Sequence, residues 1–306
     1  MTTAARRPLI TVVGGANADL VGIPEGRFAL RDSNPGHVRR SPGGVGRNVA
    51  ENLARIGAEV RLVTAFGDDE EATWLAAECE ADGMDTSFSV QATGIPGCRY
   101  VAVLDGTGDL AAAVNDMRAL DVLTPDALDP AAFEGADAVV FDTNLHGSTI
   151  ARIAELAGDI PLVLDPVSTA KAPKTIPVLG RLAAFKGNLR EAEELSGAAG
   201  AEGAANRLLL TGAERVFVTM GAGGVWCASA SGSFAVPAFP ASVANATGAG
   251  DAFTAGVAWG IATGMTLRQT AEWASAMSAI ALESERTVSE EMTAEAVRVR
   301  MEADSR

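Results

Sequence analysis

The sequence predicts a doubly wound α/β fold of three layers, in which helices cover both faces of a mainly parallel sheet. Short apolar runs alternate with segments of helical periodicity along most of the 306 residues, and such alternation is typical of βαβ units. The runs are almost continuously apolar, as expected of strands buried on both faces. We expect strands at Leu9–Val13, Val60–Ala65, Ala138–Phe141, Pro161–Leu164 and Arg215–Thr219.

Helical periodicity separates these runs and then dominates the last sixty residues. The helices expected between strands are Val45–Ile56, Glu70–Asp82, Ser148–Ala157, Leu189–Ser196 and Ala201–Leu210. The helices expected at the end of the chain are Gly250–Ala262, Leu267–Glu283 and roughly Ser289–Met301. Parallel strands need crossover connections of this kind, so the helices fit the predicted sheet.

Two segments interrupt the βαβ pattern and predict a small antiparallel sheet that projects as a lid. The first spans about residues 18–41 and is rich in Gly, Pro, Asn and Asp, whereas the second, about 96–116, alternates like a hairpin around Asp105-Gly106. We expect the two to pair, although two separate surface hairpins are the alternative. An exposed sheet usually has to be covered, which predicts a homodimer through the lid. With no long linker, residues 1–306 are expected to form one domain.

Composition excludes several classes of function. The net charge is −15, from 24 basic and 39 acidic residues, which argues against nucleic acid as a partner because phosphate backbones bind Lys/Arg patches. No apolar run reaches the roughly 18 residues that a membrane span needs, and no signal-peptide pattern is present, so we expect a cytoplasmic protein. Cys79, Cys98 and Cys227 are widely spaced, which favours buried or free thiols over disulfides or zinc.

The stretch Asn245–Phe253, which reads N-A-T-G-A-G-D-A-F, combines an anion-binding turn with a carboxylate. Gly248, Ala249 and Gly250 leave backbone N–H groups unobstructed where a helix begins, and these donors together with the helix dipole favour an anion. Asp251 follows beside that anion, where it can accept a proton from an attacking hydroxyl. By itself, the pattern also fits an ordinary Gly-rich helix start with Asp in its first turn.

Two further turns have the chemistry of a sugar site. Gly43 and Gly44 precede a helix, and Asn48 lies one turn into it, where its amide can both donate to and accept from hydroxyls. Asn17 and Asp19 directly follow the first strand, and an Asp at this edge can accept two hydrogen bonds from a vicinal diol. Ordinary Gly-rich and Asx turns are the alternatives. The Rossmann and P-loop fingerprints are both absent.

In this order, and over about residues 9–285, these patterns resemble the ribokinase (PfkB) family of carbohydrate and nucleoside kinases. The marks of that family are G-G-x-x-x-N, matched by Gly43–Asn48, and [DN]-x-T-G-A-G-D-x-F, matched by Asn245–Phe253. Asn188–Glu191 matches its N-x-x-E motif, and Val218–Gly224 matches the strand and Gly-rich turn over which the nucleotide lies. The resemblance implies a ribokinase-like fold. It also implies an enzyme that transfers a phosphoryl group from ATP to a sugar or nucleoside hydroxyl, with Mg²⁺ as a cofactor.

The resemblance also implies a role for each matched residue. Asp251 would be the general base, and the N–H groups at Gly248, Ala249, Gly250 and Asp251 would form the anion hole. The residues implied to hold the sugar are Asn17, Asp19, Gly43, Gly44 and Asn48. Glu191, with Asn188, would act through Mg²⁺ and its waters. The residues implied to lie at the nucleotide are Asn188, Thr219, Gly221, Gly224, Asn245 and Ser278, although small residues near Ser278 also fit plain helix–sheet packing.

A narrower resemblance is to bacterial pseudouridine kinases, and it implies that the 5′-hydroxyl of pseudouridine is the acceptor. The segments that carry it are Gly43–Gly57, Val114–Met117 and Asp165–Lys171. Asn115 and Asp116 lie where the second lid segment returns to the body, and we expect them to read the polar edge of the base. Lys171 is expected to pair with charge on substrate or phosphate. A plain Asn-Asp turn and a solvated loop lysine are the alternatives.

Asn245 departs from the Asp that is usual at this position in ribokinases. Many relatives use a bound K⁺ near the anion hole, and Asn245 and Thr247 are the candidate residues for such an ion here. A neutral amide replaces an anionic ligand, which weakens this implication. Backbone carbonyls could still bind the ion, so activation by a monovalent cation stays open.

Other functions compete with this interpretation. Within the same class, the alternatives are kinases of ribose, of another nucleoside or of a hexose. From a different class, the chain could be a catalytically silent sugar-binding member of the fold, but an intact Asp251 with its G-A-G argues against that. A nicotinamide oxidoreductase is disfavoured by the missing dinucleotide fingerprint.

Overall fold

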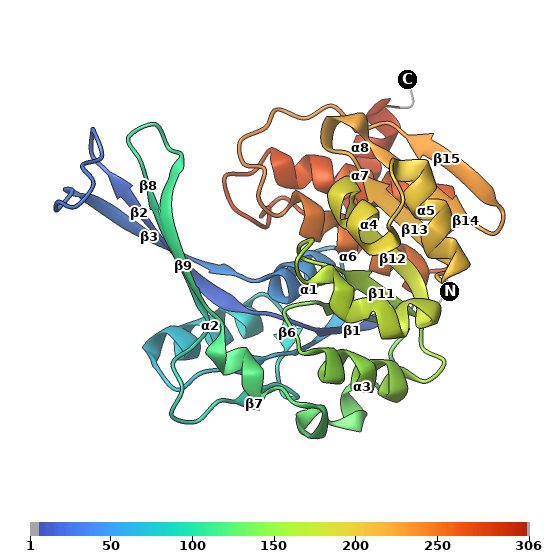
Figure 1. The fold of residues 1–306 in the computed structure, drawn as a ribbon, viewed down its shortest axis with the longest axis horizontal. Coiled ribbons are helices and arrows are strands. Elements are labelled where there is room, and N and C mark those ends of the chain that lie inside the picture. The colour runs from blue at the N-terminus through green and yellow to red at the C-terminus, as the bar shows by residue number, and fades with distance from the viewer. Residues whose placement is uncertain (1–5, 305–306) are drawn as a thin grey trace, which may run out of the picture.

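A nine-stranded sheet lies between two layers of helices in the computed structural model, which describes residues 6–304 (Figure 1). The strands, in their order across the sheet, are β15 (Gly232–Val236), β14 (Val225–Ser229), β13 (Arg215–Thr219), β12 (Leu182–Asn188), β11 (Leu162–Asp165), β10 (Ala138–Asp142), β1 (Leu9–Val13), β4 (Glu59–Val63) and β6 (Met84–Asp85). All neighbours from β13 to β6 pair in parallel, whereas β14 and β15 are antiparallel at one edge. The predicted three-layer, mainly parallel fold is confirmed.

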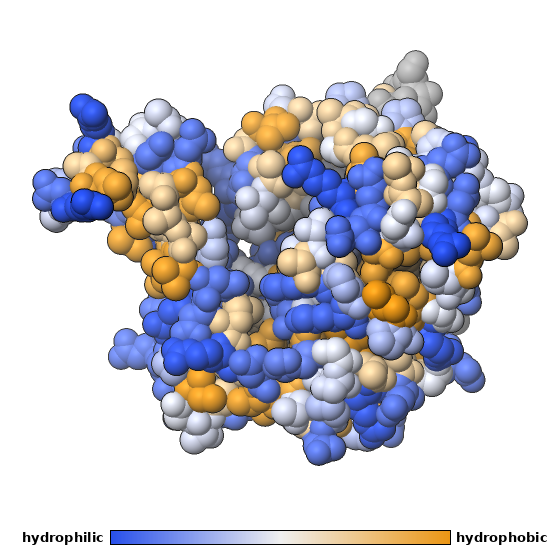
Figure 2. Space-filling view, in the orientation of Figure 1, coloured by the Kyte–Doolittle hydropathy of each residue, from blue (hydrophilic) through white to orange (hydrophobic). Residues whose placement is uncertain are grey.

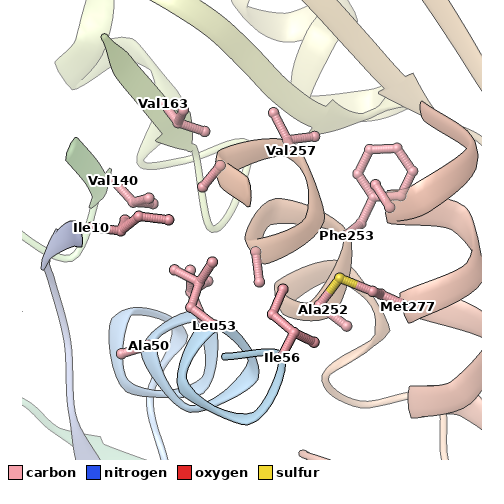
Figure 3. Close-up of a cluster of buried hydrophobic side chains, with 14 of the residues drawn as sticks. Ile10, Ala50, Leu53, Ile56, Val140, Val163, Ala252, Phe253, Val257 and Met277 are labelled. Carbon is pink, nitrogen blue, oxygen red and sulfur yellow. The ribbon is translucent and has the colours of Figure 1, made fainter. Parts of the chain in front are cut away.

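Each face of the sheet has its own buried core. Alternate residues of β1 point to opposite faces, so Ile10 and Val12 join one cluster and Val13 joins the other. Figure 3 shows the first cluster, in which Leu53 and Phe253 from two helices face the strands. The helices of this layer are α1 (Val45–Arg55), α2 (Glu70–Ala81), α6 (Ala249–Ala262), α7 (Leu267–Leu282) and α8 (Ala294–Asp304). The helices of the opposite layer are α3 (Gly147–Ala157), α4 (Leu189–Ser196) and α5 (Ala201–Leu210).

A second sheet of four strands projects from the body (Figure 1). Its order is β3 (Gly36–Gly43), β2 (Asn17–Pro24), β8 (Arg99–Leu104) and β9 (Leu110–Asp116). The pairs β2–β3 and β8–β9 are antiparallel hairpins, and the parallel pair β2–β8 joins them. The two segments that interrupt the βαβ pattern therefore do pair with each other, and the surface is hollowed between this sheet and the body (Figure 2).

The remaining elements are short. A two-stranded pair consists of β5 (Ala65–Phe66) and β7 (Val90–Gln91). The 3-10 helices occupy Arg118–Val122, Pro125–Ala127, Pro130–Ala132, Ala172–Arg181 and Gly221–Gly223. The three cysteines are buried free thiols, as expected. None of the helices within residues 6–304 is both long and apolar enough to cross a bilayer.

Among the strands longer than two residues, three differ from the expectations, as does one helix boundary. β12 was not predicted because its sequence, L-A-A-F-K-G-N, contains Ala, Lys and Gly, which are depleted in strands. β14 and β15 were also missed. The last helix was expected from about Ser289 but begins at Ala294, because the hydroxyl of Thr293 accepts a hydrogen bond from the N–H of Ala296 and caps it there.

The topology puts a ligand crevice at the carboxyl end of β1. From β1 the chain builds the sheet in one direction through β4 and β6, whereas β10 to β13 extend it in the other. Ligands of open α/β sheets bind where the strand order reverses in this way. The turns that follow β1 and β10, together with the start of α6, are therefore the place to examine for a site.

Candidate active site

The start of α6 has the geometry of an anion-binding turn. Gly248 has φ 89°, and a Cβ at this position would lie 2.0 Å from the carbonyl oxygen of Thr287, so only glycine fits. Helix α6 begins at Ala249, and the first N–H groups of a helix have no partner within it. The backbone from Gly248 to Asp251 therefore presents donors at the positive end of the helix dipole, as the sequence predicts.

Asp251 lies in the first turn of α6 and contacts the opposite helix. Its Oδ2 accepts a hydrogen bond of 2.8 Å from Nδ2 of Asn48, in α1. Burial raises the pKa of Asp251 to about 7, with a further contribution from the charge of Asp165, while Asn48 and the ammonium of Lys186 act in the opposite direction. A carboxylate whose pKa lies near neutral pH can both take up and release a proton, as a general base must.

The proposed sugar residues lie together on the other side of Asn48. Nδ2 of Asn17 donates to Oδ1 of Asp19 over 2.6 Å. Gly43 faces the same carboxylate, because a Cβ at Gly43 would lie 2.3 Å from Oδ2 of Asp19. Gly44 has φ 99°, and its missing side chain allows close packing on the backbone of Gly15. Gly43 therefore lets the Asp19 carboxylate pack against the backbone, and Gly44 lets the start of α1 pack closely on the turn after β1.

Sequence reasoning missed a set of polar residues at the end of β10. Asp142 is buried and accepts hydrogen bonds from the N–H groups of Gly15 and Asn144, each of 2.8 Å. Burial raises the pKa of Asp142 to about 6. Oδ1 of Asn144 accepts a hydrogen bond of 2.6 Å from Nζ of Lys171. The predicted Lys171 is thus held at the edge of the crevice, and its neighbour Asn144 could have been suspected only from its place directly after a strand.

Asn115 and Asp116 lie at the end of β9, where the projecting sheet returns to the body, as predicted. Asn115 is exposed, and its strand partner is Tyr100, which in turn lies beside Asp19. Asp116 forms an ion pair of 2.7 Å with Arg118. Asn115 therefore shares a face of the projecting sheet with Asp19, whereas the Asp116 carboxylate already has a partner.

A cavity of about 270 Å³ opens beside the anion-binding turn. Its walls include Gly250 at one end and mostly small or apolar side chains elsewhere. Four of the residues predicted for the nucleotide line it, namely Thr219, Gly221, Gly224 and Ser278. Ser278 also donates a hydrogen bond of 2.7 Å to the carbonyl of Ala249, which ties α7 to the start of α6.

Asn188 and Glu191 form the capping box of α4 rather than part of that cavity. The Asn188 side chain accepts from the N–H of Glu191 over 3.0 Å, and Glu191 Oε2 accepts from the N–H of Asn188 over 2.8 Å. Burial raises the pKa of Glu191. No cluster of three or more His, Cys, Asp or Glu side chains suited to a metal occurs within the described part of the chain. A single carboxylate fits a Mg²⁺ ion that keeps its own waters.

Asn245 and Thr247 do not line the nucleotide cavity. Oδ1 of Asn245 accepts a hydrogen bond from the N–H of Thr247 over 2.9 Å, and Nδ2 donates to the carbonyl of Glu285 over 3.2 Å. Both polar atoms of the Asn245 side chain are thus engaged with backbone groups, and its amide N–H is turned to the Glu285 carbonyl oxygen. The donor set of the Asn245 side chain does not fit a K⁺ ion in this arrangement.

Lys186, in the unpredicted strand β12, reaches the anion-binding turn from below. A Cβ at Gly250 would lie 3.2 Å from Nζ of Lys186. The ammonium pairs with Asp165 over 3.0 Å, and both side chains are buried. Sequence reasoning missed this residue because its strand was missed.

A carboxylate with a raised pKa, the unpartnered N–H groups at the start of α6, the polar cluster around Asp19 and a cavity of small and apolar side chains meet at one crevice, as expected of a phosphotransferase of the ribokinase-like fold. The chain belongs to the pfkB family of carbohydrate kinases, whose model matches residues 7–294. It is therefore a phosphotransferase with a sugar or nucleoside acceptor, and kinases of this family use ATP with Mg²⁺.

Known proteins similar to this chain include enzymes with different acceptors. The chain is 33% identical to a pseudouridine kinase of Escherichia coli, over 91% of each chain. It is 26% identical to a ribokinase of Bacillus subtilis, over 89% of this chain and 92% of that one. Among solved structures, a carbohydrate kinase from Agrobacterium tumefaciens is 30% identical with a TM-score of 0.86, covering 96% of this chain and 97% of the other.

Proposed function

We propose that this kinase phosphorylates the 5′-hydroxyl of pseudouridine with ATP, to give pseudouridine 5′-phosphate. The observation that carries the chemistry is the hydrogen bond between Asn48 and Asp251, which joins the sugar side of the crevice to the anion-binding turn. The choice of pseudouridine is supported by the similarity to the pseudouridine kinase of Escherichia coli.

In the proposed reaction, Asp251 accepts the proton of the 5′-hydroxyl as that oxygen attacks the γ-phosphorus of ATP. The bond from the γ-phosphorus to the bridging oxygen breaks, and ADP leaves. The N–H groups from Gly248 to Asp251 stabilise the charge on the transferring group. The ammonium of Lys186 lies beside Gly250 and adds a fixed positive charge there. The protein contributes mainly position and charge, as is usual for phosphoryl transfer.

The two substrates are held from opposite sides of Asp251. We assign the ribose diol to Asp19, with Asn17, Gly43, Gly44 and Asn48 around it. We assign the adenine to the cavity that contains Thr219, Gly221, Gly224 and Ser278. Glu191, with Asn188, would hold waters of a Mg²⁺ ion, which when bound neutralises charge on the phosphates. We assign no step to a monovalent cation, because the Asn245 side chain does not fit one.

The acceptor assignment is tested by an ADP-release assay with pseudouridine, uridine, ribose, adenosine and fructose. We expect the highest kcat/KM with pseudouridine. Asn115 shares a face with Asp19, and we propose that its amide reads the N–H that pseudouridine has in addition to those of uridine. Replacing Asn115 with alanine should therefore reduce the preference for pseudouridine over uridine by about tenfold, the value of one hydrogen bond.

Two results would overturn these assignments. A higher kcat/KM with ribose or adenosine would replace pseudouridine with that acceptor while leaving the kinase chemistry intact. An unchanged preference in Asn115→Ala would remove Asn115 from base recognition.

The acid side of the pH profile should report Asp251. Its pKa is raised from 3.8 to about 7, so the carboxylate is protonated and inactive as a base below that pH. We expect kcat/KM to fall about tenfold per pH unit as the pH decreases below about 7. In Asn48→Ala, the loss of a donor to the charged form should shift this limb to higher pH. A flat profile from pH 8 to pH 5.5 would exclude Asp251 as the base.

We further propose that the projecting sheet is a lid and that it forms a homodimer interface. The face opposite Asp19 has an exposed apolar patch, with Val38 and Val114 72% and 68% exposed and Val101 on a strand between theirs. A second copy of the same sheet would cover this patch with matching apolar residues. The opposite face, which carries Asp19, would then close over the sugar and exclude water.

Substitution of the patch tests the dimer. Val38→Asp should convert a dimer into a monomer in sedimentation equilibrium, because the carboxylate would be buried without a partner. Leu210→Asp is the matched control, since Leu210 is 78% exposed but lies on α5, away from the lid. A wild-type protein that is monomeric at micromolar concentration would contradict the proposal.

A further inference from the structure

Asp165, at the end of β11, connects three parts of the crevice although its carboxylate is buried, with 4% of the residue exposed. Oδ2 accepts hydrogen bonds from Nζ of Lys186 over 3.0 Å and from Oγ1 of Thr254 over 2.6 Å. Oδ1 accepts a hydrogen bond of 2.9 Å from the N–H of Val167. A buried carboxylate is costly unless it is saturated in this way, so both oxygens are committed to holding other groups.

The first group is the ammonium beside the anion-binding turn. Lys186 is almost fully buried, and its Nζ would lie 3.2 Å from a Cβ at Gly250. Burial alone would lower the pKa of Lys186, but the carboxylates of Asp165 and Asp251 raise it above its ordinary value. Asp165 therefore both places this ammonium and keeps it charged.

The second group is the helix that carries the general base. Thr254 lies one turn after Asp251 in α6, and its hydroxyl contacts both Asp165 and the carbonyl oxygen of Gly250, the latter at 3.1 Å. This hydrogen bond ties the first turn of α6 to the end of β11. A small movement of that turn would displace Asp251 and the N–H groups beside it.

The third group is a loop that reaches the other end of the crevice. Val167 has φ 59°, which is disfavoured for a β-branched residue. The hydrogen bond from its N–H to Asp165 helps hold this conformation. Four residues later, Lys171 donates to Asn144, next to Gly15. The loop thus runs from the buried carboxylate to the proposed substrate side.

We propose that Asp165 is a positioning residue for phosphoryl transfer, which holds the Lys186 ammonium, the first turn of α6 and the 166–171 loop in one arrangement. This inference rests on the proposed kinase chemistry but not on pseudouridine as the acceptor. Asp165 contacts neither substrate, because its oxygens are taken by protein donors. Its effect on the reaction passes through Lys186 and Asp251.

Asp165→Asn is the first test, measured with whichever acceptor the wild type turns over best. The amide keeps the shape but loses the charge and can no longer accept at both oxygens, so kcat should fall about 30- to 300-fold while the KM for the acceptor changes less than threefold. The acid limb of the pH profile should also move to lower pH. The charged groups around Asp251 are Asp165, Asp142 and Lys186, and removing the negative charge of Asp165 favours the ionised base.

Asp142→Asn is the matched control. Asp142 and Asp165 are direct neighbours across the parallel pair β10–β11, and both are buried. Asp142, however, binds the N–H groups of Gly15 and Asn144, so its substitution should change the KM for the acceptor more than kcat. If Asp165→Asn and Asp142→Asn change kcat and the acceptor KM in the same proportion, the proposed positioning role of Asp165 is wrong.

Substitutions of Thr254 test whether Asp165 acts by positioning α6 or only by stabilising the fold. Thr254→Val removes the hydroxyl with little change of shape and should lower kcat about tenfold, whereas Thr254→Ser should restore at least half of the wild-type kcat. Equal activity of the Val and Ser variants would overturn the link to α6.

A substrate-free measurement separates failure of this inference from failure of the proposed function. The folded-state pKa of Asp251 lies above its unfolded value, so the wild-type free energy of unfolding should decrease as the pH rises from 4 to 7. In Asp165→Asn this decrease should be smaller. If the wild type phosphorylates no acceptor, the proposed function is wrong. If the free energy of unfolding of Asp165→Asn depends on pH as steeply as that of the wild type, the positioning inference is wrong, whatever the function.

Discussion

Asp251→Asn should lower kcat by about 10²- to 10⁴-fold while leaving the KM for MgATP within about threefold. The amide has the shape of the carboxylate and can still accept the hydrogen bond that Asn48 donates over 2.8 Å, but it cannot take a proton from the attacking hydroxyl. The expected loss is the usual contribution of general base catalysis. Activity within about tenfold of the wild type, in the ADP-release assay, would contradict the assignment of Asp251 as the base.

The same substitution should stabilise the protein above neutral pH. Burial raises the pKa of Asp251 to about 7, so the folded state at pH 8 carries a carboxylate that would ionise more easily in the unfolded chain. Removing it should increase the free energy of unfolding by roughly 1–4 kcal/mol at pH 8 and by little at pH 4. Asp126→Asn is the control, because Asp126 is exposed and lies in a surface 3-10 helix. It should change neither activity nor stability.

Gly43→Ala should weaken acceptor binding while leaving the nucleotide side intact. The added Cβ would lie 2.3 Å from Oδ2 of Asp19 and 2.7 Å from its Cγ, so the carboxylate must rotate away from the proposed ribose diol. Losing hydrogen bonds to a charged acceptor should raise the acceptor KM about 10²-fold, with little change in the KM for MgATP. Steady-state kinetics with each substrate varied in turn measures both values.

Gly203→Ala is the matched control for this substitution. Gly203 lies inside α5, and its Cβ would make only an ordinary contact, 3.9 Å from the Cβ of Ala198. Alanine should therefore leave the kinetics unchanged and stabilise the helix by about 0.5–1 kcal/mol. If Gly43→Ala also leaves the acceptor KM unchanged, Asp19 does not bind the acceptor.

The sequence could predict those parts of the site that depend on local backbone. The turn at Gly248–Asp251 and the glycines before α1 are short-range features, because positive φ values and the exposed N–H groups of a helix start are written in neighbouring residues. The βαβ order and the projecting sheet were predictable for a similar reason, since strand and helix periodicities differ over a few residues. These local signals predict the fold class and the class of chemistry without any long-range contact.

The sequence could not predict the groups whose role depends on burial and on distant partners. Lys186 lies in a strand of atypical composition, and only the pairing of β12 between β11 and β13 brings its ammonium to Gly250. Asp142 and Asp165 are adjacent only because β10 and β11 align in register. The local sequence around each residue contains no sign of these contacts.

The sequence by itself therefore determined the fold class, the Gly-rich start of α6 and the choice of Asp251 as the proposed general base in this kinase. Only the tertiary structure decided the electrostatics around that base. The pKa of Asp251 is set by burial, by Asp165 and by a hydrogen bond from Asn48, which is 203 positions away in the chain. Burial and charge interactions depend on distance in space rather than in sequence, so they become defined only when the sheet and its helices have packed.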